Sequence, residues 1–142
     1  MYEEKKQQAK LLMAFKAEID TIIELIETRK YINSIENILQ SSLNAQAPSY
    51  FRIPISINLY TKTFEAHLKD VAMLPERVSK QIIRFYMLIF ALSEDLSTLA
   101  GTNQMPFQDF LNVLTTDIQL LHKVIFIGKD VSKLIDVEAS YL

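Results

Sequence analysis

The sequence predicts an all-α protein: an up-and-down four-helix bundle with long first and last helices, one short helix and an extended connector. Apolar residues recur at alternating steps of three and four, which aligns them along one side of a helix. The 142 residues include only two glycines, whereas β-sheets use glycine at turns and bulges. In addition, 49% of the residues are apolar, which is enough to form the core of a single domain over residues 1–142.

The first helix is predicted over residues 1–43. Its apolar seam follows the steps 3, 4, 3, 4 and consists of Leu12, Phe15, Ile19, Ile22 and Ile26. Arg29 and Lys30 occupy the positions where the seam should continue, and it resumes near Ile35, displaced around the helix. A local change of supercoil or a kink can absorb such a shift. An uninterrupted helix of this length would reach roughly 60 Å, so we expect its polar end, residues 1–10, to project beyond the bundle.

Residues 44–60 form the one substantial stretch without a helical pattern. Pro48 and Pro54 disfavour the interior of a helix. Apolar residues alternate with other residues from Phe51 through Ile53 onward, which is the period of a half-buried strand. Because no other part of the chain offers a second strand, we interpret the stretch as an extended connector laid across the bundle. A short helix, or a strand paired with another chain, are the alternatives.

Residues 61–101 are predicted to form a short helix followed by a long one. The long helix has an unbroken seam at steps of four and three, made of Val78, Ile82, Phe85, Ile89, Leu92, Leu96 and Leu99. Pro75 favours its start, and Gly101 is expected to close it as a left-handed cap. The middle of this helix is apolar almost all round, so we expect it to be the packed centre between the first helix and the last.

The last helix is predicted over residues 106–142, beginning near Pro106. Its seam repeats the same spacing and consists of Phe107, Leu111, Leu114, Ile118, Leu121, Ile125 and Gly128. Glycine inside a helix costs about 1 kcal/mol relative to alanine, so we expect Gly128 to allow close approach of another helix or to mark a bend. The long first and last helices would leave part of their seams exposed, which favours a homodimer.

Composition and charge argue against several classes of function. The net charge is −2 and the basic residues are scattered, unlike the basic patches of nucleic-acid-binding proteins. The sequence contains no cysteine, which removes disulfides, thiolate metal sites and cysteine nucleophiles. No window of about eighteen residues is free of charge, so we expect no transmembrane helix. The first residues also lack the pattern of a secretory signal.

No catalytic, cofactor-binding or metal-binding residues are predicted, and we expect no enzyme. His67 and His122 each lie beside an apolar seam, as half-packed boundary histidines do, and neither has the glutamate three residues earlier that marks di-iron bundles. Neither has the context of a Ser-His-Asp triad, and the glycines of a phosphate-binding loop are missing. We interpret Glu94 and Asp95 as part of a solvated face, with a buried carboxylate pair as the alternative.

One arrangement of residues resembles a known group of proteins. It comprises Leu59-Tyr60, His67-Leu68, Leu74-Pro75-Glu76 and Ile82-Ile83-Arg84-Phe85-Tyr86, in this order. Over about thirty residues it is similar to small bacterial helical proteins of uncharacterised function, although His67 stands where that group has asparagine. Those proteins often have one N-terminal membrane helix just before their first bundle helix. The resemblance implies a soluble domain related to an anchored protein, and it implies no catalytic residues.

These observations predict a non-enzymatic helical interaction module. We expect it to bind a protein partner or a second copy of itself, and to reach a membrane only through an N-terminal anchor. The expected location is the cytoplasm, at the inner face of the membrane if the chain is anchored. The alternative is a carrier or sensor that binds an apolar small molecule in the core, among Phe85, Phe90 and Phe110.

The candidate interaction surface combines the first helix, the connector and a basic face of the long helix. Arg77, Lys80 and Arg84 share that face in its first turns, where the helix dipole disfavours cations. The complete set is Leu12, Phe15, Phe51, Ile53, Arg77, Lys80 and Arg84. Charged replacements of Leu12 and Phe15 are expected to abolish association and to leave the fold intact.

Overall fold

The computed structural model describes residues 2–49, 60–101 and 105–142, and every regular element in this part of the chain is a helix. The helices are α1 (Tyr2–Thr28), α2 (Tyr31–Ala45), α3 (Lys62–Ala66), α4 (Leu68–Val71), α5 (Glu76–Gly101) and α6 (Phe107–Ser140). The predicted all-α class is therefore confirmed.

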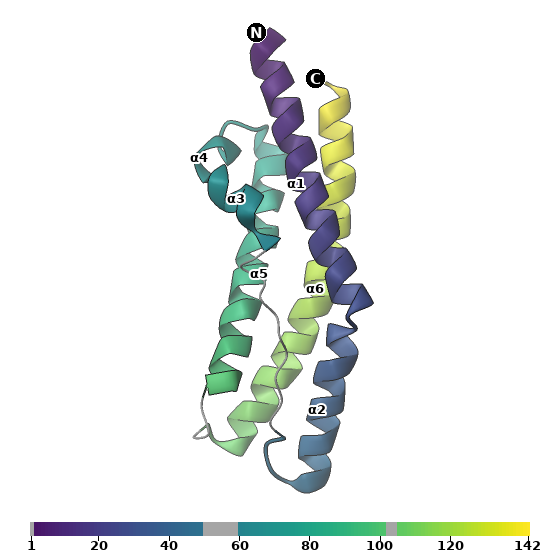
Figure 1. Ribbon diagram of the computed structural model, residues 1–142, viewed down its shortest axis with the longest axis vertical. Coiled ribbons are helices and arrows are strands. Elements are labelled where there is room, and N and C mark those ends of the chain that lie inside the picture. Colours follow the sequence, from purple (N-terminus) through teal and green to yellow (C-terminus); the bar gives the residue numbers. More distant parts are fainter. Residues whose placement is uncertain (1, 50–59, 102–104) are drawn as a thin grey trace.

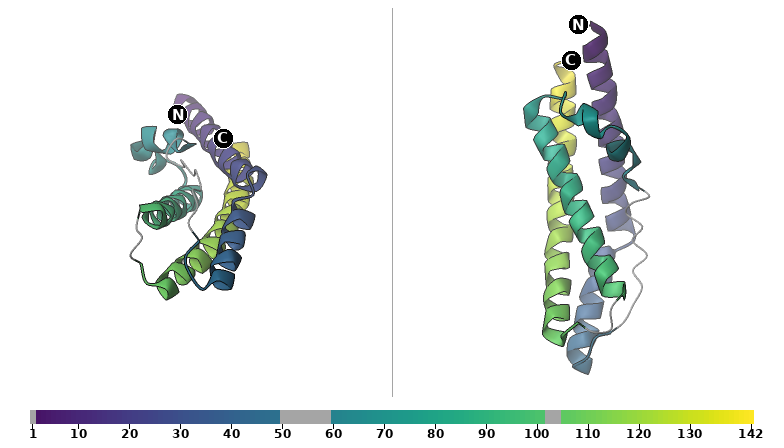
Figure 2. Two further views of the ribbon diagram at one scale, coloured as in Figure 1. Left: turned by 60° about the horizontal axis from the view of Figure 1, so that its bottom comes forward. Right: turned by 90° about the vertical axis from the view of Figure 1, so that its left-hand side faces the viewer.

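The centre of the molecule is α6. It packs against α1, α2 and α5, and it runs antiparallel to all three (Figure 1). In the views of Figure 2, α1 and α2 follow one another along one side while α5 lies on another side. The expectation that the long helix over residues 61–101 would be the packed centre is wrong, because α6 packs extensively on α1, α2 and α5, whereas the extensive contacts of α5 are with α6.

A glycine explains how α6 can approach its neighbours so closely. A Cβ atom at Gly128 would collide with the side chain of Ile23 on α1 and would lie 2.8 Å from Cε2 of Phe85 on α5. Both contacts would be closer than two carbon atoms tolerate, so only glycine fits this crossing without a shift of its neighbours. Of the two expectations for Gly128, close approach is the one that the structure supports.

The first predicted helix is divided into α1 and α2 at the point where the seam breaks. Lys30 adopts the left-handed helical conformation, with φ of 53°, and thereby interrupts the right-handed helix. Its N–H donates to the Glu27 carbonyl at 3.2 Å, and the Arg29 N–H donates to the Leu25 carbonyl at 3.0 Å. These bonds satisfy the last carbonyls of α1 in the manner of a left-handed cap. The interruption is therefore a kink between two helices.

The first turns of α1 project beyond the neighbouring helices, and both chain ends lie at this same end of the molecule (Figure 1). This agrees with the expectation for residues 1–10. The short predicted helix is interrupted at His67, which separates α3 from α4. The connector begins two residues later than the predicted residue 44, because α2 continues to Ala45. Residues 50–59, which include Phe51 and Ile53, lie outside the described part of the chain.

Two further details differ from the sequence analysis. Gly101 is the last residue of α5, but no described glycine has a positive φ, so the left-handed cap expected there is wrong. In addition, α6 is long and apolar enough to cross a membrane by length and composition, although no such helix was expected. The core helix of a soluble protein meets the same criterion, and α6 is packed on three other helices.

Candidate functional site

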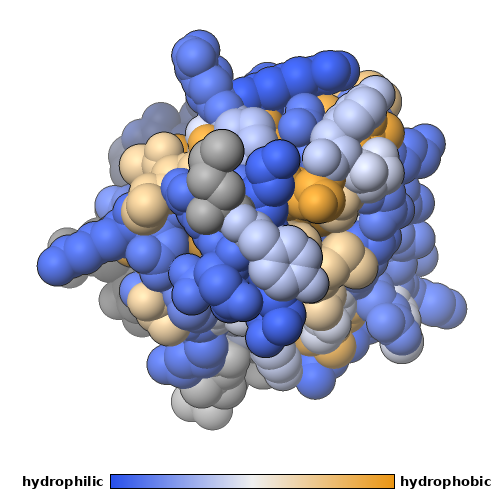
Figure 3. All heavy atoms as spheres, turned by 90° about the horizontal axis from the view of Figure 1, so that it is seen from above, coloured by the Kyte–Doolittle hydropathy of each residue, from blue (hydrophilic) through white to orange (hydrophobic). Residues whose placement is uncertain are grey.

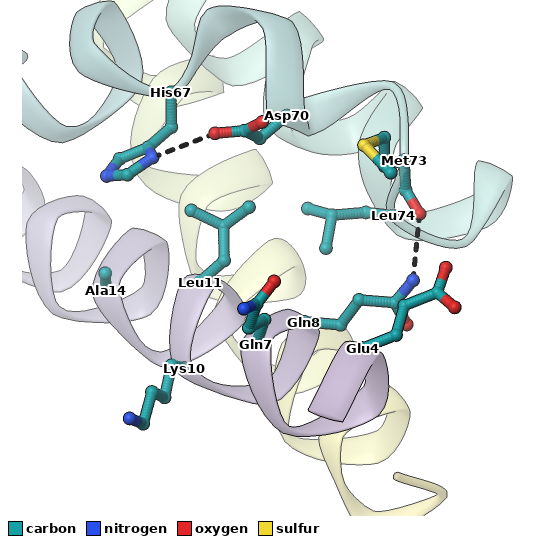
Figure 4. Close-up of a pocket in the computed structure, with 10 residues that line it drawn as sticks. All are labelled: Glu4, Gln7, Gln8, Lys10, Leu11, Ala14, His67, Asp70, Met73 and Leu74. Carbon is teal, nitrogen blue, oxygen red and sulfur yellow. Dashed lines mark hydrogen bonds and ion pairs between the residues drawn. The ribbon is translucent and has the colours of Figure 1, made fainter. Parts of the chain in front are cut away.

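A groove of about 470 Å³ lies between the first half of α1 and the segment that runs from α3 to the start of α5. Leu11 and Leu74 face one another across it, and Ala14 extends its apolar wall along α1 (Figure 4). Leu74 is buried, whereas Met73 beside it is 63% exposed. Seen from this end, hydrophobic patches lie among hydrophilic side chains (Figure 3).

Glu18 on α1 fixes the position of α3 at the inner end of this groove. Its Oε2 accepts a hydrogen bond from Thr63 N at 2.6 Å, and its Oε1 accepts one from Phe64 N at 3.3 Å. These amides belong to the first turn of α3, where backbone N–H groups have no partner inside the helix. The Tyr86 hydroxyl on α5 also donates to Glu18 Oε1, at 2.5 Å. A single carboxylate therefore joins α1, α3 and α5.

Aromatic rings pack around this carboxylate. Phe64 stacks on Tyr86 with ring centroids 4.2 Å apart, and Phe15 meets these rings edge-on at 6.4 Å and 6.2 Å. Burial, and then the Glu18 carboxylate, raise the pKa of Tyr86 far above its usual range, so its hydroxyl remains a donor. Edge-on and stacked rings add about 0.5–1.5 kcal/mol per pair to the free energy of their burial. The cluster therefore gives the groove a rigid inner end.

At the outer end, a side chain of α1 holds the turn that precedes α5. Gln8 Nε2 donates a hydrogen bond to the Met73 carbonyl at 3.1 Å. This bond connects positions 65 residues apart in the sequence and keeps the exposed Met73 side chain beside α1. Both ends of the groove are thus joined to α1 by a side chain of that helix: Glu18 accepts hydrogen bonds at the inner end, and Gln8 donates one at the outer end.

The rim of the groove carries charge on both walls. His67 Nδ1 lies 3.2 Å from Asp70 Oδ2 on the α3–α4 side. Glu4 lines the α1 side, whereas Lys10 is directed away from the apolar walls (Figure 4). The described residues contain no group of three or more histidine, aspartate or glutamate side chains placed to hold a metal ion. The apolar walls and the charged rim are suited to binding a side chain or a short peptide segment.

The predicted surface residues are not brought together here. Leu12 and Phe15 are both 0% exposed and form part of the core, because the seam on which they lie faces the inside of the bundle. Their assignment to an interaction surface is wrong, and at such buried positions charged replacements are instead expected to destabilise the fold. Arg77, Lys80 and Arg84 are exposed on α5 and do not line the groove.

Two acidic residues of α1, Glu18 and Glu27, interact with groups other than this basic face. Lys80 Nζ lies 3.0 Å from Glu76 Oε1 on its own helix. Glu18 binds α3 and Tyr86, and Glu27 Oε1 lies 3.3 Å from Lys129 Nζ on α6. The role of the basic face in binding a partner stays a prediction.

Sequence reasoning missed the groove residues. The sequence pattern identifies Pro75 only as the start of a long helix and His67 only as a boundary histidine. A signal was present, because the apolar pair Met73-Leu74 occupies a turn where polar residues are usual. Glu18 gave no such signal, since its donors come from residues 45 and 68 positions away.

A second unusual group lies in the core, far from the groove. Asp117 on α6 is 0% exposed, and neither of its carboxylate oxygens has a hydrogen-bond partner in the described part of the chain. Burial, and then the neighbouring Asp95 carboxyl on α5, raise the pKa of Asp117 to about 8. The described structure shows no hydrogen bond between the two side chains, and Asp95 acts on Asp117 as a neighbouring acid. Glu94 is exposed, as expected of a solvated face, whereas Asp95 is half-buried beside Asp117.

The fold and the groove define a small all-α protein with a surface site formed at one end. Comparisons of the chain with protein-family models, with curated proteins and with solved structures found no match. The resemblance of residues 59–86 to small bacterial helical proteins therefore stays a prediction.

Proposed function

We propose that this protein is a non-enzymatic interaction module that binds an amphipathic helix of a partner protein in the groove beside α1. The observation that supports this most directly is the apolar lining, in which Leu11 and Leu74 face one another beside the exposed Met73. A groove of about 470 Å³ has room for the few apolar side chains that such a helix presents at steps of three and four. Methionine adapts its shape to a partner because its side chain is unbranched and polarizable.

Charge at the rim favours a helix that carries basic residues beside its apolar stripe. Glu4 on α1 and Asp70 on α4 are exposed on opposite walls of the groove. Lys10 is directed away from it, so the groove presents carboxylates at its rim (Figure 4). Lysine or arginine residues flanking the apolar stripe of a partner would lie near these carboxylates and speed association. We therefore propose a basic partner helix rather than an acidic one.

In this proposal the molecule is an up-and-down bundle with four members: α1 with α2, α3 with α4, α5, and α6. The partner helix would lie against the projecting part of α1. A membrane anchor joined to this end of α1 would hold the groove close to the inner face of the membrane in the cytoplasm. The resemblance of residues 59–86 to anchored bacterial proteins supports this location.

A carrier for an apolar small molecule is the second candidate function. The groove is lined by none of Phe85, Phe90 and Phe110, the residues expected to form a ligand pocket. Phe85 and Phe110 are buried among other core residues. Bound ligand in native mass spectra of the purified chain would support the carrier over the interaction module.

Binding of a model peptide tests the interaction module. The probe is a fluorescein-labelled peptide of ~18 residues, made of leucine on one helical face and lysine on the other, which is long enough to form a helix on binding. We expect micromolar affinity by fluorescence anisotropy. Met73→Lys should weaken binding at least about tenfold, since it removes an apolar contact and adds a like charge. Phe126→Lys is the matched control, because Phe126 is also exposed (68%) but lies on α6 outside the groove.

Three results would count against the proposal. The first is equal binding of the peptide by the wild type and by Met73→Lys. The second is equal loss of affinity in Phe126→Lys, which would indicate a general effect of charge. The third is a wild-type dimer, by light scattering, that Met73→Lys converts to a monomer, because this would assign the groove to a second copy of the chain.

A further inference from the structure

The buried acid at Asp117 occupies a core position that an apolar residue would normally fill. It lies between Leu114 and Leu121 on the inward face of α6, and all three side chains are 0% exposed. The N-terminal half of α6, which contains Asp117, lies between α2 and the C-terminal end of α5 (Figure 1). A neutral carboxylic acid can be tolerated at such a position, whereas an unpartnered carboxylate is costly to bury.

The elements packed around Asp117 supply no compensating charge among the described residues. The charged residues near the end of α5 are Asp95 and the exposed Glu94, and both are acidic. The one charged residue of α2 is Glu36, which is exposed. On α6 itself, Asp109, His122 and Lys123 are exposed.

The third helix packed on α6, α1, contacts a different part of it. Its contacts there involve Gly128, Lys129 and Ser132, which meet Ile23, Glu27 and Lys16 respectively. Gly128 lies about three helical turns beyond Asp117. Ionisation of Asp117 therefore leaves a negative charge beside another acid, and no described cation pairs with it.

We propose that Asp117 is a proton-controlled switch in the half of the bundle formed by α2, the end of α5 and the start of α6. When Asp117 is protonated, this half is closed around it. When Asp117 is ionised, α5 separates from α6 far enough to hydrate the carboxylate, while the half held by Gly128 and the Glu18 cluster stays folded.

The pH range of the switch follows from the direction of the pKa shift. The pKa of Asp117 in the folded bundle is raised to about 8 from an ordinary value of 3.8. The contribution of this proton to the closed state is therefore complete below about pH 4 and is lost as the pH rises through about 8. The transition falls in the range of a neutral or slightly alkaline cell interior.

Amide hydrogen exchange of the full chain, followed by mass spectrometry at pH 6 and pH 9 and corrected for intrinsic exchange rates, tests the switch. We expect protection of residues 107–121 to fall at least about tenfold more than that of residues 128–140. In Asp117→Asn, which keeps the shape of the protonated acid, the two regions should respond alike. An equal loss of protection in both regions of the wild type would overturn the switch and reduce Asp117 to a general effect on stability.

Direct titration keeps the proposal testable if Asp117→Asn does not fold. The carboxyl carbon of Asp117, followed by NMR in the wild type, should titrate with a midpoint above pH 6. Asp95→Asn removes the neighbouring acid and should move this midpoint to lower pH. A wild-type midpoint below pH 5, or an unchanged midpoint in Asp95→Asn, would refute the electrostatic basis of the switch.

Discussion

The two halves of the bundle each contain a carboxylate between their helices, half-buried at Glu18 and fully buried at Asp117, and they treat it in opposite ways. In the half that forms the groove, Glu18 accepts hydrogen bonds from two backbone amides and the Tyr86 hydroxyl. In the other half, Asp117 is more deeply buried and has no hydrogen-bond partner among the described residues. The Glu18 carboxylate joins three helices through its hydrogen bonds. The Asp117 carboxyl makes the closed state depend on a proton.

The difference shows that the partners of a buried acid decide its effect on stability. Hydrogen bonds to a charged group contribute about 1.5–3 kcal/mol each, and they favour a single arrangement of the groups that donate them. Without such donors the same chemical group favours its neutral form and destabilises the fold when it ionises. The half with Glu18 is therefore suited to a rigid binding site, and the half with Asp117 to a conformational change.

The largest effect is expected when an unpartnered acid is introduced into the half that lacks one. Leu12→Asp places a carboxylate at a fully buried position of α1, and we expect the free energy of unfolding to fall by more than about 4 kcal/mol, or the chain not to fold. Urea unfolding followed by circular dichroism measures the change. Met13→Asp is the control, since Met13 is 48% exposed on the same helix. Similar losses in the two variants would show that burial is not the cause.

Removing the acid from the other half should have the next largest effect, with the opposite sign. Asp117→Asn is expected to raise the free energy of unfolding by several kcal/mol at pH 8.5 and to change it little at pH 4. The free energy of unfolding of the wild type should fall by this amount between these pH values. The reason is that unfolding releases the proton that the folded chain still holds. Urea unfolding at a series of pH values measures the difference between the two proteins. Asp109→Asn, an exposed change on the same helix, should show no such pH dependence.

Weakening the partnered carboxylate tests the first half of the comparison. Glu18→Gln retains one carbonyl oxygen but replaces the other acceptor by an amide that can only donate. We expect the free energy of unfolding to fall by about 1–3 kcal/mol, and the α3 amides to exchange faster with solvent. A double-mutant cycle with Tyr86→Phe separates the hydroxyl bond from the backbone bonds. If Glu24→Gln, an exposed change on α1, has the same effect, the network around Glu18 does not have the role assigned to it.

A steric change at the helix crossing should have a smaller effect. Gly128→Ala gains about 1 kcal/mol of helix propensity but forces Ile23 and Phe85 to move, so we expect a net loss of about 1–2 kcal/mol. The shift in thermal unfolding temperature measures it. Ile23→Val removes the methyl group nearest to Gly128, and it should recover part of the loss when combined with Gly128→Ala. If Gly128→Ala is as stable as the wild type, α6 does not depend on glycine at this crossing.

The sequence predicts most of the helices because their seams are regular. The interruption at Arg29 and Lys30 was visible as a break in spacing, and the structure gives it a left-handed residue. The seam of the last helix was predicted through Ile118, whereas the buried line passes through Asp117. The spacing allows either Ile118 or Asp117 at this step, and the apolar residue was assigned to the seam. The buried carboxylate was therefore not predicted.

The groove could not be predicted to the same extent. Periodicity identifies the buried side of each helix, but the groove depends on where a short helix rests on a long one. That position is set by Glu18, whose partners are distant in the sequence. The apolar residues of the first helix were therefore assigned to an exposed surface, although their seam is the part of α1 that the bundle buries.

The smallest effect is expected at an acid whose partner is exposed to water. Lys80 and Glu76 form an ion pair on α5 with 71% and 81% of their side chains exposed. Exposed pairs of this kind contribute about 0.5 kcal/mol or less, so Lys80→Ala should change the free energy of unfolding by no more than this amount. Urea unfolding at low and high salt measures the change. A loss comparable to that of Glu18→Gln would mean that proximity alone, rather than burial with complete hydrogen bonding, determines how much a carboxylate stabilises this bundle.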